Sequence, residues 1–322
     1  MVRKIFGFLF LILFFIFFYL YFSLSYQNKL KKPQEFEIKK GDLPKTIFKK
    51  LKDKRAILNW QSLYIYLILK NEDRKIKAGE YLIEPRMRAI DMIKNFIKGK
   101  TKEIKITLKE GWTIFDYAKE LSQKGICSYD DFLLEARNVP KWIDAKNLEG
   151  FLYPDTYFFK RDTDAKEVVL KLYKNFLEKT KDLRLELQKK DLKPLEWVTL
   201  GSIVEKEAKF EEEKPKIAGV YLNRLKIKMK LEADPTILYA MRLAGIENKI
   251  LLKKDLNFQS EYNTYLNFGL PPGPICNPSL SSLKAVLYPE KHNFYYFVSK
   301  GDGSHFFSTN LKDHIKAIQL YR

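Results

Sequence analysis

The sequence predicts an α+β protein that begins with a single membrane-spanning helix. Three observations carry this prediction. Residues 5–28 contain no charged side chain, short strand patterns alternate with helical patterns from residue 36 onward, and the chain closes with a hairpin pattern followed by a helix. With 322 residues, 46% of them apolar, the chain is long enough for about two domains and can bury a sizeable core.

The charge balance is strongly basic. Fifty-nine Lys and Arg against 40 Asp and Glu give a formal net charge of +19, which favours a polyanionic neighbour such as nucleic acid, anionic lipid or an acidic wall polymer. No RNP-like, zinc-finger or phosphate-loop pattern is present, so nucleic acid is not expected as a partner. Two cysteines, Cys127 and Cys276, and three histidines make a zinc site improbable, and we expect no metal and no cofactor. Whether the two cysteines pair stays open.

Residues 5–26 are predicted to form a transmembrane helix. Their apolar part, residues 5–22, would be about 27 Å long as a helix, which nearly matches a hydrocarbon core of about 30 Å. Basic residues lie on both sides and do not decide the orientation. The short tail of residues 1–4 favours an N-terminus inside the cell and the bulk of the chain outside. The alternative is a signal peptide cut after the small residues of 23–25.

After a polar tether at 27–35, two similar stretches follow. Residues 36–51 and 106–121 each predict a short strand, a glycine turn and an amphipathic helix. Between them, 77–85 predicts a strand and 89–100 a helix that ends at a glycine. This order indicates a small α+β module. A true duplication is one explanation of the two similar stretches, and a chance likeness between strand–glycine–helix units is the other.

The C-terminal half alternates between loops, helices and a final hairpin. Residues 149–159 predict a loop packed by aromatic side chains, and 162–190 predict highly charged helices. Residues 293–300 and 305–310 flank a Gly-Asp-Gly-Ser turn and predict a hairpin. A helix is expected to run from there to the C-terminus.

Glu207 is the first candidate for chemistry. On a helical wheel of residues 195–210, Glu207 lies on the apolar stripe near Leu200, whereas Glu205 points toward solvent. Removal from water raises the pKa of a carboxyl group, and a carboxyl that keeps its proton near neutral pH can act as a general acid. The alternative is that Glu207 lies at the edge of the stripe and forms a salt bridge with a basic neighbour.

Arg224 and Asp234 are the next candidates. Arg224 lies within the apolar stripe of the helix at 214–227 and needs an anionic partner, for which Glu207, Asp234 or a substrate are the options. A pair with Glu207 would lower the pKa of that carboxyl and weaken it as an acid. Asp234 and Pro235 together predict the start of a helix with Asp234 as N-cap, and a role as second carboxylate is the alternative.

A polar and aromatic segment follows at 262–265. Tyr262, Asn263, Thr264 and Tyr265 offer amide, hydroxyl and aromatic groups side by side. Sugar rings present hydroxyl edges and apolar faces, so these residues suit a carbohydrate site. The prolines and glycines of 269–274 then predict a rigid irregular loop.

Taken in order, these pieces resemble the endolytic murein transglycosylases of the MltG (YceG-like) family. The likeness covers nearly the whole chain, including the apolar segment at the N-terminus. Departures are mild: Gly201, Leu231-Glu232 and Asp313 replace commoner residues, and none removes an acid. The matching stretches are 79–83, 149–157, 202–208, 217–225, 233–240, 262–289 and 295–318.

The resemblance implies a single-span protein of the inner (cytoplasmic) membrane. A LysM-like α+β module would occupy 36–145, and a mixed helical and β-hairpin catalytic domain, 146–322, would lie on the periplasmic side. Such enzymes cut the β-1,4 bond between N-acetylmuramic acid and N-acetylglucosamine within glycan strands and leave 1,6-anhydromuramyl ends. The implied partners are peptidoglycan, the lipid bilayer around 5–26 and the peptidoglycan synthases of elongation and division. Cleavage would limit the length of the glycan strands that these synthases make.

The resemblance and the wheel together place the catalytic acid at Glu207, with Glu205 as fallback. Arg224, Asp234 and the segment 262–265 would position the substrate. The LysM-like module matches weakly, so its affinity for glycan stays open. Two alternatives remain: a muramidase-type hydrolase that uses Asp234 as base, and a wall-binding scaffold without turnover.

Overall fold

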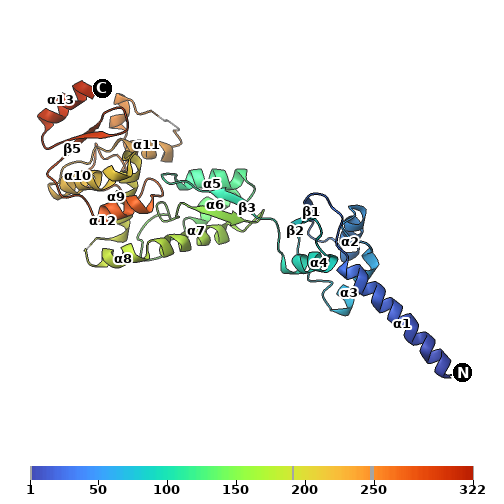
Figure 1. Ribbon diagram of the computed structural model, residues 1–322. Coiled ribbons are helices and arrows are strands. Elements are labelled where there is room, and N and C mark those ends of the chain that lie inside the picture. Colours follow the sequence, from blue (N-terminus) through green and yellow to red (C-terminus); the bar gives the residue numbers. More distant parts are fainter. Residues whose placement is uncertain (1, 191, 247–249, 322) are drawn as a thin grey trace. The chain divides into compact units, whose positions relative to one another are not determined.

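The structure is a computed structural model that describes residues 2–190, 192–246 and 250–321, and it divides into two compact units. Unit 1 is Met1–Ile104 and unit 2 is Lys105–Arg322 (Figure 1). Over the described residues, helices are combined with three two-stranded sheets, β1–β2, β3–β4 and β5–β6. This confirms the mixed α and β character that the sequence predicts.

Unit 1 places one short sheet against three helices. Antiparallel pairing sets Phe36 opposite Tyr81, and both rings are buried with Phe96 in the core. Helix α3 (Trp60–Leu69) has no counterpart in the sequence prediction. Its elements are α1 (Val2–Ser25), β1 (Gln34–Ile38), α2 (Pro44–Asp53), α3 (Trp60–Leu69), β2 (Gly79–Ile83) and α4 (Ala89–Lys98).

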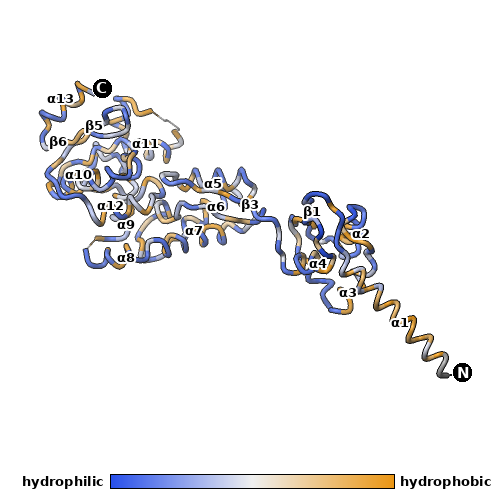
Figure 2. The backbone as a smooth tube through the Cα atoms, viewed as in Figure 1, coloured by the Kyte–Doolittle hydropathy of each residue, from blue (hydrophilic) through white to orange (hydrophobic). Residues whose placement is uncertain are grey.

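Helix α1 is long and apolar enough, over Ile5–Ser25, to cross a membrane. None of its most apolar stretch is buried against the rest of the chain, and Figure 2 shows it coloured as hydrophobic along most of its length. The helix starts at Val2 and therefore includes residues 2–4, which were expected to form a short tail before it. Met1 lies outside the described residues.

Unit 2 is built around helix α9. All eight residues from Trp197 to Val204 are buried, since α10, α11 and α12 pack on α9. A side chain at Gly201 would meet Leu283 of α12 at 2.9 Å, so the glycine permits this close approach. The elements of unit 2 are β3 (Ile104–Thr107), α5 (Ile114–Gln123), α6 (Tyr129–Glu135), β4 (Thr156–Phe159), α7 (Ala165–Lys179), α8 (Lys181–Gln188), α9 (Pro194–Glu207), α10 (Lys214–Lys226), α11 (Asp234–Leu243), α12 (Leu280–Leu287), β5 (Tyr296–Ser299), β6 (His305–Ser308) and α13 (Leu311–Tyr321).

Two features of the organisation differ from the expectation. The expected loop at 149–159 ends in strand β4, which pairs with β3. The second strand–glycine–helix stretch has the predicted local structure, but it packs within unit 2 instead of forming one module with residues 36–104. Both cysteines are free thiols; Cys276 is buried, and burial raises the pKa of Cys127 to about 11.

A buried carboxylate and a buried amide explain why the second stretch belongs to unit 2. The carboxylate of Glu149 accepts hydrogen bonds from the backbone N–H of Ile114, at the start of α5 (3.1 Å), and from the side-chain amide of Asn277 (3.2 Å). The amide oxygen of Asn277 accepts from the N–H groups of Gly150 (3.0 Å) and Leu152 (3.1 Å). These contacts join three segments that are distant in sequence, and burial raises the pKa of Glu149 to about 8.

Replacing Asn277 is therefore expected to destabilise the protein strongly. In Asn277→Ala two buried N–H groups lose their acceptor, which should lower the free energy of unfolding by about 2–4 kcal/mol. Urea denaturation followed by circular dichroism measures the change. Asn138→Ala is the control, because Asn138 is exposed and, among the described residues, its side chain bonds only to the nearby Glu135. Equal losses in both variants would contradict the role given to Asn277.

Candidate functional site

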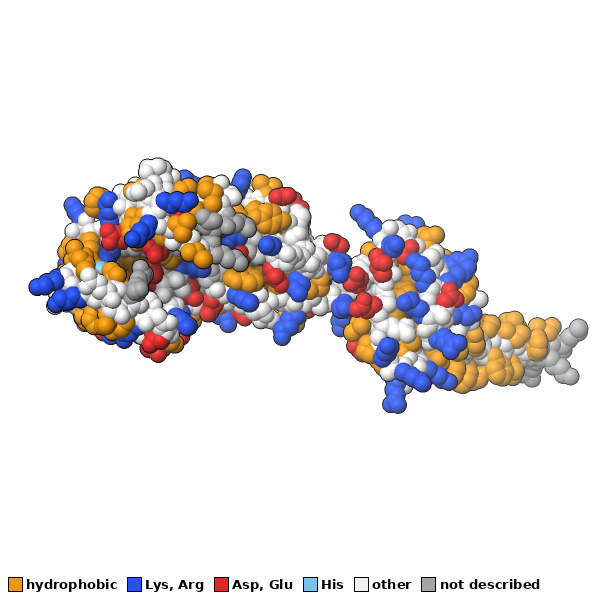
Figure 3. Space-filling model, turned by 90° about the horizontal axis from the view of Figure 1, so that it is seen from above, with side chains coloured by type: hydrophobic (Ala, Val, Ile, Leu, Met, Phe, Trp, Pro, Cys, Tyr) orange, Lys and Arg blue, Asp and Glu red, His pale blue; other side chains and the backbone are white. Residues whose placement is uncertain are grey.

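A pocket of about 350 Å³ opens where α9, α10 and α11 meet the β5–β6 hairpin and α13. Figure 3 shows acidic side chains gathered at a hollow on this face of unit 2. The pocket combines carboxylates, aromatic rings and two histidines. Its lining residues are Glu207, Tyr221, Arg224, Leu231, Glu232, Asp234, Tyr265, Phe297, Val298, Ser299, His305, His314 and Ile318.

Glu207 is the last residue of α9 and is half-buried in the pocket wall. Burial raises its pKa to about 7, the negative charge of Asp234 acts in the same direction, and a hydrogen bond from Tyr221 and the charge of Arg224 act against it. The hydroxyl of Tyr221 donates to Oε1 of Glu207 at 2.9 Å. The C-terminal end of a helix also carries partial negative charge and disfavours a carboxylate. A fraction of the Glu207 carboxyls therefore carries a proton at neutral pH, as a general acid requires.

Arg224 is buried as predicted, and its guanidinium contacts backbone carbonyls and one carboxylate. Its guanidinium donates to the carbonyl oxygens of Tyr295 (2.6 Å) and Leu231 (2.8 Å), and its ion pair is with Glu232 at 3.4 Å. A salt bridge from Arg224 to Glu207 or Asp234 is absent from the described residues, so two of the three options are not observed, and pairing with a substrate stays a prediction. Backbone carbonyls satisfy the buried guanidinium, and the pKa of Glu207 escapes the lowering that a direct pair would cause.

Asp234 lies one position further into α11 than predicted. The N-cap position belongs to Ala233, whose N–H donates to the hydroxyl of Thr264 at 2.9 Å, so the prediction that Asp234 is the N-cap was wrong. The carboxylate of Asp234 instead accepts a short hydrogen bond from the hydroxyl of Tyr265, at 2.6 Å. Both side chains line the pocket with Glu207.

The segment 262–265 divides between pocket and scaffold. Tyr265 is the member of the segment that lines the pocket. Asn263 is buried and donates to the carbonyls of Leu256 and Phe258, and Thr264 is buried against the start of α11. Tyr262 packs against Tyr239, with ring centroids 5.1 Å apart.

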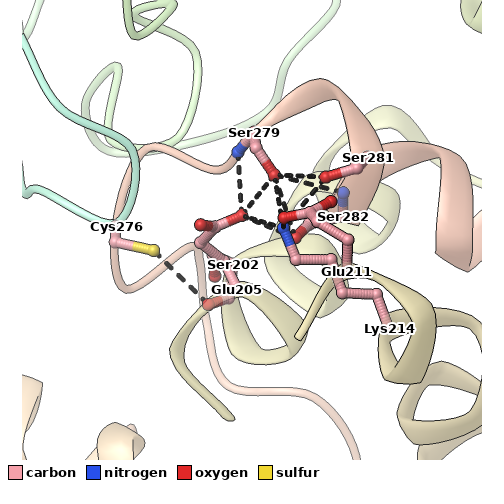
Figure 4. Close-up of polar contacts among 8 residues, drawn as sticks. All are labelled: Ser202, Glu205, Glu211, Lys214, Cys276, Ser279, Ser281 and Ser282. Carbon is pink, nitrogen blue, oxygen red and sulfur yellow. Dashed lines mark hydrogen bonds and ion pairs between the residues drawn. The ribbon is translucent and has the colours of Figure 1, made fainter. Parts of the chain in front are cut away.

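Glu205 lies in a separate polar cluster (Figure 4). Its carboxylate accepts hydrogen bonds from the N–H of Ser279 (3.0 Å) and from the hydroxyls of Ser279 and Ser282 (both 2.5 Å), and it lies 3.5 Å from the ammonium of Lys214. The Glu205 side chain is 10% exposed and that of Lys214 is 3% exposed. The prediction that Glu205 faces solvent was wrong, because α9 is surrounded by other elements and has no single apolar face. Glu205 fixes α9 to the start of α12.

The comparisons with known proteins decide the family. The model of the YceG-like family matches residues 36–320 of this chain.

The chain belongs to the YceG-like family.

Relatives of this YceG-like chain carry the name endolytic murein transglycosylase. The Bacillus subtilis protein is 33% identical over 83% of this chain and 79% of its own length. A Streptococcus pneumoniae protein of serotype 2 is 29% identical over 74% of this chain, which spans about half of that longer relative (49%). A solved structure of a yceG-like protein from Listeria monocytogenes superposes with a TM-score of 0.62 at 33% identity and covers 89% of this chain and 99% of the other.

Several pocket residues of this YceG-like protein were not predicted as site residues. Tyr221 lies in the predicted helix at 214–227, and Phe297 and His305 lie in the predicted hairpin, but none of the three was among the predicted site residues. Nδ1 of His305 lies 2.7 Å from the carboxylate of Glu213, which anchors β6 beside the start of α10. Hydrophobic periodicity carries no information on which hairpin meets which helix end, so no local signal could have found these residues.

The two neighbours of Glu207 should shift its pKa in opposite directions. Tyr221→Phe removes a hydrogen bond to the ionised form and should raise the pKa above about 7; Asp234→Asn removes a repulsive charge and should lower it. NMR titration of the full chain with ¹³C-labelled glutamate carboxyl groups measures both shifts without any need for activity. Shifts of the same sign in the two variants would contradict this electrostatic description of the site.

The cluster around Glu205 should matter for stability. Within the described part of the chain, Lys214 is buried with two carboxylate partners, Glu205 and Glu211. Glu205→Gln removes the charge of one of them, and the free energy of unfolding should fall by about 1–3 kcal/mol. Thermal and urea denaturation measure the loss. Glu212→Gln, at an exposed position, is the matched control and should stay within about 0.5 kcal/mol of the unsubstituted protein.

Proposed function

We propose that this protein is an endolytic murein transglycosylase that cleaves the β-1,4 bond between N-acetylmuramic acid and N-acetylglucosamine within glycan strands. The observation that carries the proposal is a carboxyl group with a pKa of about 7, Glu207, in the wall of a polar and aromatic pocket. The names of the Bacillus and Streptococcus relatives support the same activity.

In the proposed mechanism Glu207 acts first as acid and then as base. The protonated carboxyl donates to the glycosidic oxygen while the bond to C1 breaks and an oxocarbenium-like state forms. The C6 hydroxyl of the muramyl residue attacks C1, and its proton passes to the carboxylate of Glu207. The product is a 1,6-anhydromuramyl end; no water is consumed, in contrast to hydrolysis with two carboxylates.

The other pocket residues would bind and orient the sugar rings. Tyr265 and Phe297 offer aromatic faces, whereas Asp234 and Glu232 offer acceptors to sugar hydroxyls. Arg224 would act as a positioning residue, since its guanidinium ties the backbone of Leu231 to that of Tyr295 and so holds two walls of the pocket together. Asn263 and Thr264 would act only through the loop that carries Tyr265.

The layout of the chain completes the proposal. Helix α1 would anchor the protein in the cytoplasmic membrane with its N-terminus inside, and unit 2 would face the wall as the catalytic domain. The short sheet and helices of unit 1 would form the LysM-like module. Cleavage near the membrane would limit the length of new glycan strands beside the synthases of elongation and division, and the basic composition suits contact with anionic wall and lipid.

Asp234 supports a second candidate, a muramidase-type hydrolase. It lines the same pocket as Glu207 and could activate a water molecule on the opposite face of the sugar. The product separates the two reactions, because anhydro ends are lighter than reducing ends by one water. A wall-binding scaffold without catalytic activity is the third candidate. It requires that a variant unable to cleave glycan still replace the native protein in the cell.

Glu207→Gln should abolish cleavage without unfolding the protein. General acid catalysis contributes about 10²–10⁴-fold, so the rate on purified peptidoglycan should fall by that factor. Because only the protonated form can start the reaction, the native rate should also decline as pH rises through about 7. Mass spectrometry of the muropeptides measures both the rate and the type of end.

Glu212→Gln serves as the control and should cleave normally. Full activity in Glu207→Gln would exclude Glu207 as the acid, reducing ends would favour the hydrolase, and rescue of a deletion strain by the inactive variant would favour the scaffold.

A further inference from the structure

Helix α3 of unit 1 exposes an apolar face that its own unit does not cover. Leu63 and Leu67 on one side are buried in the core of unit 1. On the other side the exposed fractions are 44% for Ile65, 47% for Ile68 and 73% for Leu69. A helix that is apolar on all sides is normally buried, so this exposed face requires a cover.

The membrane-spanning candidate lies directly beside this helix. Helix α3 packs on α1, and the side-chain amide of Asn59, the N-cap of α3, donates to the hydroxyl of Tyr19 at 2.5 Å. Tyr19 precedes the end of α1 at Ser25 by six residues, which is about 9 Å along the helix axis. The start of α3 therefore lies alongside the last apolar turns of α1, at the depth where a bilayer meets water if α1 spans it.

The connection between α1 and the rest of unit 1 is fixed and short. The side-chain amide of Asn28 donates to the carbonyls of Glu84 (2.8 Å) and Met87 (3.1 Å), and the N–H of Ala89 donates to the carbonyl of Tyr26 (3.0 Å). The first residues of the expected tether at 27–35 are thus part of the folded unit. The end of α1 consequently sets the height and orientation of α3.

The residues around the exposed face suit a lipid surface. Trp60, Tyr64 and Tyr66 of α3 are half-buried and pack in part on the core of unit 1. Each combines an apolar ring with a polar group, which is the composition found at membrane–water interfaces. Lys70 and Arg74 follow the helix as exposed cations that anionic lipid would attract. The apolar surface of α1 and that of α3 are then neighbouring parts of one lipid-contacting surface.

We propose that α3 docks on the outer leaflet of the membrane that α1 spans, with Ile65, Ile68 and Leu69 in the interfacial region. The inference rests on the proposed membrane anchoring by α1. In this arrangement unit 1 rests on the lipid surface. The contacts between α1 and the rest of unit 1, and not a flexible linker, then fix the distance of unit 1 from the membrane.

Depth-dependent fluorescence quenching tests this docking on the full chain. The chain is reconstituted into vesicles of phosphatidylcholine and phosphatidylglycerol that carry a lipid-bound quencher, in a Cys127→Ser background in which Cys276 stays buried. A fluorophore on Leu69→Cys should be quenched by lipid several-fold more strongly than one on Leu43→Cys. Leu43 is the matched control: it is 68% exposed, close to the 73% of Leu69, but it lies in a charged turn.

A third position separates this inference from the proposed anchoring. A fluorophore on Ile12→Cys, in the middle of α1, should be quenched by lipid if α1 spans the membrane. Quenching at positions 12 and 69 with none at 43 supports the docking. Quenching at 12 without quenching at 69 overturns the docking alone, and no quenching at 12 overturns the anchoring on which it rests. Circular dichroism of each variant shows that the fold is kept.

Discussion

The removal of the Glu207 carboxyl from water is the physical condition on which the site depends. That carboxyl ends a helix whose central residues are buried without interruption from Trp197 to Val204. The surrounding helices hold the group in a half-buried pocket wall, where only Tyr221 donates a hydrogen bond to it among the described contacts. Because burial outweighs that single donor, the carboxyl can keep its proton near neutral pH.

Two glutamates on the same helix illustrate how surroundings assign different roles to one residue type. Glu205 and Glu207 are two residues apart, so their side chains leave α9 roughly 200° apart around its axis. Glu205 meets three hydrogen-bond donors from the start of α12 and the ammonium of Lys214, which together fix its side chain in place. Glu207 enters the pocket, where Tyr221 donates a hydrogen bond to it and burial raises the pKa of its carboxyl to about 7.

Buried polar groups of a similar kind hold the wider scaffold together. Asn277 and Glu149 bring the start of α5, the segment at 150–152 and the loop before α12 to one point. Arg224 does the same for two walls of the pocket through backbone carbonyls. In unit 1, Asn28 ties the end of α1 to the loop before α4. Each group satisfies several buried partners at once, so its geometry is tightly determined.

The sequence by itself determined the elements whose signal is local. The uncharged run that forms α1, the strand and glycine turn before α2, the helix ended by Gly99 and the β5–β6 hairpin all follow from periodicity and turn residues. The apolar stripe and the family resemblance together singled out Glu207. Only the tertiary structure decided the orientation of Glu205, the partners of Arg224, the contact of Asp234 with Tyr265 and the apolar face of α3 beside α1. These features depend on contacts between segments that are distant in the chain, and such contacts leave no periodic pattern in the sequence.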